Sequence, residues 1–257
     1  MMSRLWKTCV AAACAVGMLA GSPRATAESV SLAFDKSVNP AVSLSGSSSG
    51  PYTQTGPFYW HDNGLPPNSN FPPPTVTFCI EVNGALPSVG GTAVFGVMTV
   101  AADLGTAKAS AITELYGRFY DTAWDSSSFA GSANSLAFQL ALWELAIDGK
   151  PAAGNTTDLS NGTFTASSAI GPAQSTAQSW LNALNGNTSL FNSRFANREL
   201  VALVAPDPNA TKPQDFQDQI TLRPKAVPAP PGVVLAGLGM LGLFARSRLL
   251  RRKEAIV

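Results

Sequence analysis

The sequence has few of the residues that build metal centres or disulfide frameworks. Its 257 residues include three cysteines and a single histidine, His61. Because a structural zinc site takes about four Cys or His ligands, the sequence offers no cluster of that kind. Charged residues make up only 13% of the chain, and no basic patch indicates a nucleic-acid partner. Thirteen phenylalanines and five tryptophans argue against a disordered chain.

The first residues predict a secretory signal peptide. Arg4 and Lys7 precede an apolar run at 10–19, and residues 25–27 read Ala-Thr-Ala. A basic segment, a short apolar run and a small-residue cleavage site are the features of such a signal. The run is too short to span a bilayer as a stable helix. We therefore expect residues 1–27 to be removed on export across the inner membrane.

The last thirty residues carry a second apolar segment, Val233–Ala245, with a different order of features. A proline-rich stretch precedes it and an arginine cluster follows. At 1.5 Å per residue the run covers about 20 Å, less than the ~30 Å hydrocarbon core, but flanking arginines can snorkel. Positive charge after the run keeps that end cytoplasmic. The globular part should therefore lie outside, tethered by its C-terminus.

This order resembles the PEP-CTERM sorting signal of Gram-negative bacteria over residues 227–253. The resemblance implies a transient inner-membrane anchor that an exosortase-type processing enzyme recognises and removes. Ala229 departs from the family pattern, because it stands where the family has a glutamate. A permanent membrane anchor is the alternative. The residues that carry the sorting signal are Pro228, Pro230, Arg246, Arg248, Arg251 and Arg252.

Between the signal peptide and the sorting signal at 227–257, residues 28–226 are expected to form one acidic domain. About 200 residues suffice for one domain with a core. The order of strand and helix patterns predicts an α+β fold, in which a small β-sheet packs with a central buried helix and two further helices. The signal peptide and the C-terminal apolar segment would add a helix at each end. The expected strands are 30–34, 75–82, 93–100, 200–205 and 219–222, and the expected helices are 106–124, 132–148 and 172–184.

The stretch 43–74 is rich in Ser, Gly and Pro, which predicts a long loop. Several aromatic residues lie within it, between Tyr52 and His61. We expect this loop to fold over the core, and its aromatic part to face a partner.

Cys79 is the one cysteine that remains after the signal peptide leaves. An unpaired cysteine in an oxidising compartment needs an explanation. A cysteine protease would have to use His61 as its base, and nothing in the sequence supports that pairing. No paired-carboxylate motif supports another hydrolase. The chain is therefore not expected to be an enzyme.

Gln139 is a second anomaly, because it lies in the apolar segment 136–145. A buried amide without partners costs about 1–3 kcal/mol. Attack of the Cys79 thiolate on the Gln139 amide, with loss of ammonia, would join both residues in an internal thioester. The alternative is that Cys79 is a small buried hydrophobe and that Gln139 hydrogen-bonds a strand end or a loop backbone.

At these residues the chain resembles the thioester domains of Gram-positive surface adhesins. In that family a Phe-Cys strand segment and a helical segment, hydrophobic-Gln-x-Ala-hydrophobic-Trp, carry the cross-link. Here the segments are Phe78-Cys79 and Phe-Gln-Leu-Ala-Leu-Trp at 138–143. The resemblance spans roughly residues 75–150. It implies that Cys79 and Gln139 form the thioester, that Phe78 and Trp143 support it, and that the bond captures an amine on a partner surface.

These features predict an exported binding protein of the cell surface or extracellular matrix, which becomes cell-surface or extracellular after C-terminal processing. It is expected to attach covalently to a surface amine through Cys79 and Gln139, or to bind a polysaccharide ligand, without a cofactor or a metal. The alternative is a passive structural component of the exopolysaccharide matrix that has no thioester.

Overall fold

A computed structural model describes residues 28–39, 42–43, 51–52, 55–64, 70–82, 84–149, 157–166, 171–205 and 216–225. The chain divides into two compact units, Met1–Arg223 and Pro224–Val257, and the fold described below is that of the first. The predicted signal peptide and the predicted sorting tail lie outside the described residues. Within the described part of the chain, no helix is long and apolar enough to cross a membrane.

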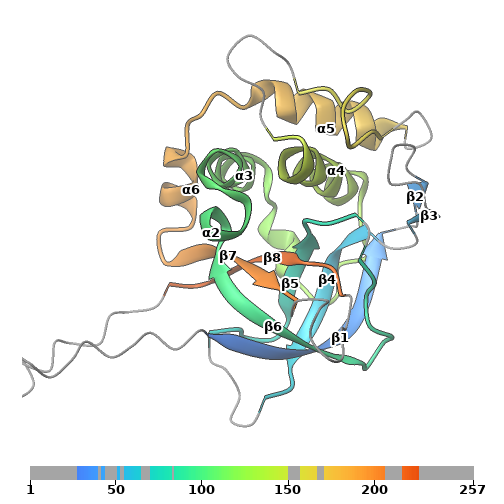
Figure 1. The fold of residues 1–257 in the computed structure, drawn as a ribbon, viewed down its shortest axis with the longest axis vertical. Helices are drawn as coiled ribbons and strands as arrows, with labels where there is room; N and C mark the ends of the chain where they lie inside the picture. The colour runs from blue at the N-terminus through green and yellow to red at the C-terminus, as the bar shows by residue number, and fades with distance from the viewer. Residues whose placement is uncertain are drawn as a thin grey trace, which may run out of the picture. The chain divides into compact units, whose positions relative to one another are not determined.

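Six strands of the described residues close into a barrel, in the order β1-β4-β5-β8-β7-β6 (Figure 1). The pairs β1–β4, β1–β6, β4–β5, β5–β8 and β6–β7 are antiparallel. Closure brings the C-terminal strand β8 beside β5, which lies in the first half of the chain. The barrel strands are β1 (Ser29–Asn39), β4 (Thr55–Asp62), β5 (Thr75–Cys79), β6 (Thr92–Thr99), β7 (Arg198–Val204) and β8 (Gln219–Pro224); β2 (Val42–Ser43) pairs with β3 (Pro51–Tyr52) in a separate small sheet.

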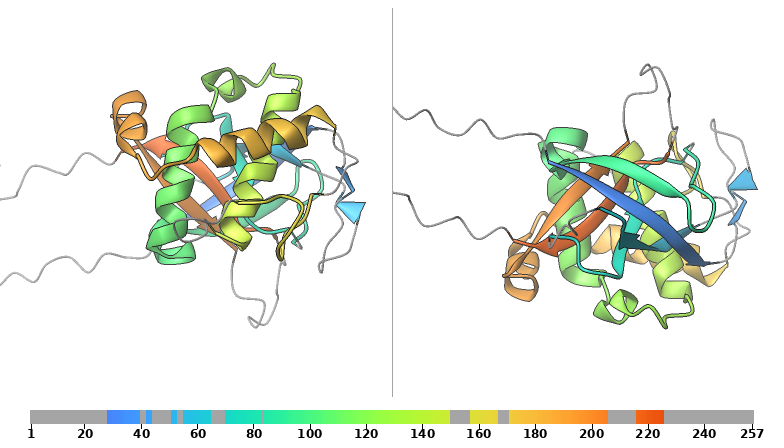
Figure 2. Two further views of the ribbon diagram at one scale, coloured as in Figure 1. Left: turned by 90° about the horizontal axis from the view of Figure 1, so that it is seen from above. Right: turned by 90° about the horizontal axis from the view of Figure 1, so that it is seen from below.

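The helices gather on one side of the barrel (Figure 1). Seen from the opposite side, β1 and β6 lie in front of them (Figure 2, right). Helix α4 (Ala133–Ile147) contacts β4 and β5 of the barrel and also the helices α3 and α5. The helices are α2 (Val100–Leu104), α3 (Thr106–Phe119), α4 (Ala133–Ile147), α5 (Pro172–Ala183) and α6 (Ser189–Arg194), with a 3-10 turn, η2 (Thr122–Asp125), between α3 and α4.

Helix α4 is the central buried helix that the sequence predicts. Twelve of its fifteen residues are buried, as an element that is apolar nearly all round requires. Ser132 caps its first turn: the Ser132 hydroxyl accepts the N–H of Ser135, and the Ser135 hydroxyl accepts the N–H of Ser132. This reciprocal capping satisfies two backbone donors and sets the start of the helix.

The α+β class is confirmed, and the predicted small β-sheet is a closed barrel of six strands among the described residues. The predicted helix 106–124 is also shorter than expected. It ends at Phe119, because Tyr120 has an extended backbone (φ −63°, ψ 127°), and Trp124 belongs to the 3-10 turn. The short helices α2 and α6 were not predicted. They have too few residues to show a helical apolar period.

The expected aromatic loop is wrong in its second half, because residues 55–62 form the barrel strand β4. Phe58, Tyr59 and Trp60 are at most 1% exposed, so they cannot form a recognition face. Gly56 and Pro57 concealed this strand, since both residue types are rare inside strands.

Candidate functional site

Cys79 is the last residue of β5 and lies opposite Gln219 in the ladder with β8. It is unpaired and fully buried. Since side chains alternate along a strand, Cys79 and Thr77 face the same side of β5 and Phe78 faces the other. Thr77 accepts a hydrogen bond from Nε1 of Trp60, at 2.8 Å.

The side of β5 that Cys79 faces is the interior of the barrel. The Trp60 ring packs against Phe34 of β1 and Phe95 of β6, with ring centroids 5.0 and 5.6 Å apart. Phe78, on the opposite side of β5, packs against Phe138 of helix α4 outside the barrel, so the side with Thr77 and Cys79 faces the barrel interior. The Cys79 sulfur therefore lies at one end of β5 within the barrel core.

Phe78 faces the helices and joins β5 to them. Its ring centroid lies 4.9 Å from that of Phe138 on α4 and 5.7 Å from that of Trp124. Ring pairs in such tilted and edge-on arrangements add about 0.5–1.5 kcal/mol beyond the area that they bury. Phe78 thus holds the strand that carries Cys79 against the helix that carries Gln139.

Gln139 is fully buried, and its side-chain amide hydrogen-bonds to the backbone of Cys79 and Gly56. Its Nε2 donates to the Cys79 carbonyl at 2.8 Å, and its Oε1 accepts the Cys79 N–H at 3.2 Å and the Gly56 N–H at 3.3 Å. The β4–β5 ladder ends just before this point, with the pair Phe58 and Thr77. The Gln139 amide therefore completes the ladder, which satisfies a buried amide in the apolar helix. A cross-link from Cys79 to Gln139 stays a prediction.

Gln217 supplies the side-chain amide that touches the sulfur. Its Oε1 accepts from the Cys79 thiol, with the oxygen 2.5 Å from Sγ. Gln217 is 5% exposed. Its N–H donates to the carbonyl of Ala85 at 2.9 Å, and Gly84 packs so closely that a Cβ there would lie 2.5 Å from Gln217 Cγ. The segment 84–85 thus packs against the backbone and Cγ of Gln217 and limits the movement of its side chain beside the sulfur.

Gln219 also contacts the sulfur and is fully buried. Its Nε2 donates to Cys79 Sγ at 3.1 Å and to the Gln217 carbonyl at 3.2 Å. Its Oε1 accepts from the Thr77 hydroxyl at 2.9 Å. Sequence reasoning missed both glutamines, although their spacing of two residues at the start of an apolar strand predicts side chains on one face.

Burial raises the pKa of the Cys79 thiol well above its ordinary value. The hydrogen bond from Gln219 acts in the opposite direction, while the negative charges of Glu81 and Asp218 add to the rise. Burial also raises the pKa of Asp218, to about 7, against the opposing hydrogen bond from the Ala205 N–H. The thiol is therefore protonated at neutral pH, and the attacking thiolate needs stabilisation from its surroundings.

Comparison of the chain with protein-family models, with curated proteins and with solved structures found no match. Within the part of the chain that the structure describes, no three His, Cys, Asp or Glu side chains are placed to hold a metal ion. His61 is exposed, and its Nδ1 lies 2.6 Å from a carboxylate oxygen of Asp35.

Trp143 joins α4 to the segment that follows Cys79. Its ring is fully buried, and its Nε1 donates to the carbonyl of Glu81 at 3.1 Å. Gln139 and Trp143 are four residues apart and so lie on the same face of α4. Gln139 hydrogen-bonds to the backbone of Cys79, and Trp143 hydrogen-bonds to the backbone of Glu81. The two residues of the helical motif therefore both fix the end of β5.

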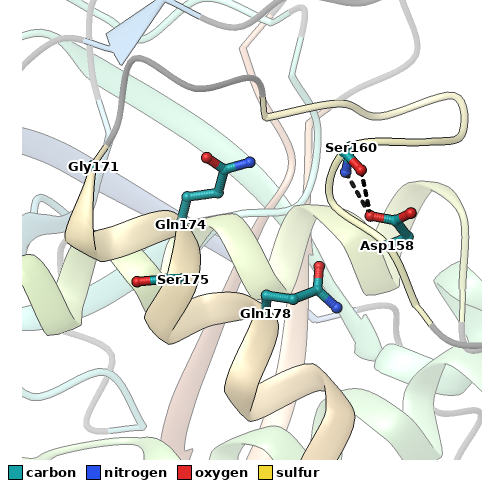
Figure 3. A pocket seen from close by; sticks show the side chains of 6 residues that line it. All are labelled: Asp158, Ser160, Gly171, Gln174, Ser175 and Gln178. Carbon is teal, nitrogen blue, oxygen red and sulfur yellow. Dashed lines mark hydrogen bonds between the residues drawn. The ribbon is translucent and has the colours of Figure 1, made fainter.

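A polar pocket of about 310 Å³ lies between the first turns of α5 and the segment 158–160 (Figure 3). Its polar groups largely bond to the protein itself: Gln178 Oε1 accepts the Leu159 N–H at 3.0 Å, and the Ser160 hydroxyl donates to Asp158 at 2.6 Å. None of the lining residues hydrogen-bonds to Cys79, so the pocket is separate from the sulfur site. The lining residues are Asp158, Ser160, Gly171, Gln174, Ser175 and Gln178.

Proposed function

We propose that this domain is a covalent binding module that attaches to a partner amine through an internal thioester of Cys79, with Gln217 as the acyl donor. The observation that carries the proposal is the direct hydrogen bond between the buried Cys79 thiol and Gln217 Oε1, which is bonded to the amide carbon that would be attacked. The Nε2 and Oε1 atoms of Gln139 instead hydrogen-bond to backbone groups. The geometry thus supports Gln217 over the predicted partner Gln139.

Formation of the bond needs no further reactant. The Cys79 sulfur attacks Cδ of Gln217, the S–Cδ bond forms and the Cδ–N bond breaks. The amide nitrogen takes the thiol proton and leaves as ammonia. A primary amine then attacks the same carbon, the C–N bond forms, the C–S bond breaks and the thiol recovers its proton. Since each domain reacts once, the module captures its partner and is not an enzyme.

Burial suits this chemistry because a thioester must be protected from hydrolysis before it meets its target. Cys79, Gln139 and Gln219 are fully buried, whereas Gln217 keeps 5% exposure. The reacting carbon thus belongs to the most exposed of these four residues. We therefore expect the amine to approach from the Gln217 side.

We propose that the module acts outside the cell, as the two terminal segments predict. The signal peptide would direct export across the inner membrane, and an exosortase-type enzyme would process the tail at 227–257. The module would then act at the cell surface or in the extracellular matrix, on an amine-bearing surface. Without a thioester, the chain would be a passive component of the matrix or a polysaccharide binder.

The intact mass of the purified mature domain tests the thioester. Loss of ammonia predicts a mass about 17 Da below the sequence value. Cys79→Ala and Gln217→Ala should restore the full mass, and both variants should still unfold cooperatively. An unshifted mass with one titratable thiol in the unmodified domain would rule out the thioester.

A further inference from the structure

We infer that Gln219 is a catalytic residue of the sulfur site, and that Thr77 and Trp60 are positioning residues that fix the direction of its amide. The inference rests on the proposed thioester chemistry of Cys79, but it concerns the environment of the sulfur itself. The contacts form one continuous chain: Trp60 to Thr77, Thr77 to Gln219, and Gln219 to the sulfur.

Donor and acceptor chemistry fixes the direction of this chain. The Trp60 indole N–H can only donate, so the Thr77 hydroxyl accepts it at 2.8 Å. The hydroxyl hydrogen is then free to donate to Gln219 Oε1, 2.9 Å away. This leaves the Gln219 NH₂ group facing the Cys79 sulfur.

A second contact gives the same orientation independently. Gln219 Nε2 lies 3.2 Å from the backbone carbonyl of Gln217. If the amide were flipped, its oxygen would face the Gln217 carbonyl oxygen, and the thiol, which already donates to Gln217 Oε1, would face a second acceptor. The carbonyl of Gln217 therefore also requires an N–H at this position.

An N–H aimed at the sulfur favours its negative form. The thiolate is the attacking species when the thioester forms, and it is the leaving group when an amine breaks the thioester. Trp60, Thr77, Cys79 and Gln219 are all fully buried, and a fixed dipole acts more strongly in such a low-dielectric site. Gln219 should therefore accelerate both steps.

Thr77→Val and Thr77→Ser form a matched pair to test the chain. Valine keeps the shape of threonine but removes the hydroxyl, whereas serine keeps the hydroxyl and loses a methyl group. In the domain that carries the thioester, the rate of methylamine adduct formation, followed by intact mass, should fall about tenfold in Thr77→Val and stay within about twofold in Thr77→Ser. Gln219→Leu should react more slowly than Thr77→Val.

The same pair is tested on the free thiol, independently of the thioester. The background for this test is a domain whose mass shows no thioester, which is either the unmodified chain or Gln217→Ala. In that background, methyl methanethiosulfonate should modify the Cys79 thiol about tenfold more slowly in Thr77→Val than in Thr77→Ser. A purely structural role for Thr77 predicts the reverse, because a loosened core exposes the thiol more often. Equal or faster modification in Thr77→Val would overturn the inference, and it would do so whether or not the proposed thioester forms.

Discussion

Replacement of Glu144 by glutamine should stabilise the domain, and only above about pH 5. Glu144 lies on α4 and is 2% exposed. Among the described residues, its Oε2 has no hydrogen-bond partner. Burial raises its pKa from 4.5 to about 8, and the charge of Asp148 adds to the rise. The folded protein therefore retains a proton that the unfolded chain releases.

The sign and the size of the effect follow from these two pKa values. Below pH 4.5 both states are protonated and the carboxyl has no effect on the free energy of unfolding. As the pH rises toward 8, the unfolded state is increasingly favoured, to a limit of about 5 kcal/mol at 1.36 kcal/mol per pH unit. Relaxation around the carboxylate lowers this limit, so we expect Glu144→Gln to gain about 1–3 kcal/mol at pH 8.

Urea unfolding of both proteins at pH 4, 6, 8 and 9 measures this difference. The two proteins should have nearly equal stability at pH 4, which serves as the internal control. The advantage of Glu144→Gln should grow up to about pH 8 and then level off. A difference that is constant from pH 4 to pH 9, or a variant that is less stable at pH 8, would contradict a raised pKa of Glu144 in the folded protein.

Two further predictions concern the residues around the sulfur. Gly84→Ala places a Cβ 2.5 Å from Gln217 Cγ, so intact mass should show far less thioester, and stability should fall by about 1–3 kcal/mol. The control Gly96→Ala, whose Cβ would meet nothing closer than 3.8 Å, should keep the thioester; a full mass deficit in both variants would contradict the placement of Gln217. Gln139→Leu leaves the N–H and carbonyl of Cys79 without this partner and should lower the free energy of unfolding by about 3 kcal/mol in urea, while the folded protein keeps the mass deficit.

Local sequence signals predicted the elements whose stability is mainly local. Helix α4 has a capping residue, Ser132, and an unbroken apolar run, so both its start and its central position could be predicted. Strand β5 is rich in β-branched residues. Cys79 stood out because the other two cysteines lie in the predicted signal peptide, which leaves Cys79 without a disulfide partner.

The glutamines at the sulfur could not be found in this way, because barrel closure brings them there. Gln217 is 138 positions from Cys79 in the sequence, and only the β5–β8 pairing places them together. Gln139 attracted attention because its neighbours are apolar, yet it proves to bond to the backbone at the end of β5. Strand β4 was missed because Gly56 and Pro57 interrupt its pattern. Gly56 is needed there, since a Cβ at this position would lie 2.8 Å from Gln139 Oε1.

The position of the methylamine adduct shows whether Cys79 is joined to Gln217. The mature domain is treated with methylamine, digested and sequenced by tandem mass spectrometry, and the free thiol of Cys79 is labelled after the reaction. We expect N-methylglutamine at position 217 and a newly labelled Cys79, with Gln139 and Gln219 unmodified. An adduct at Gln139 would show that the thioester joins Cys79 to Gln139 on α4 and not to Gln217. The absence of an adduct at every glutamine would contradict the thioester itself.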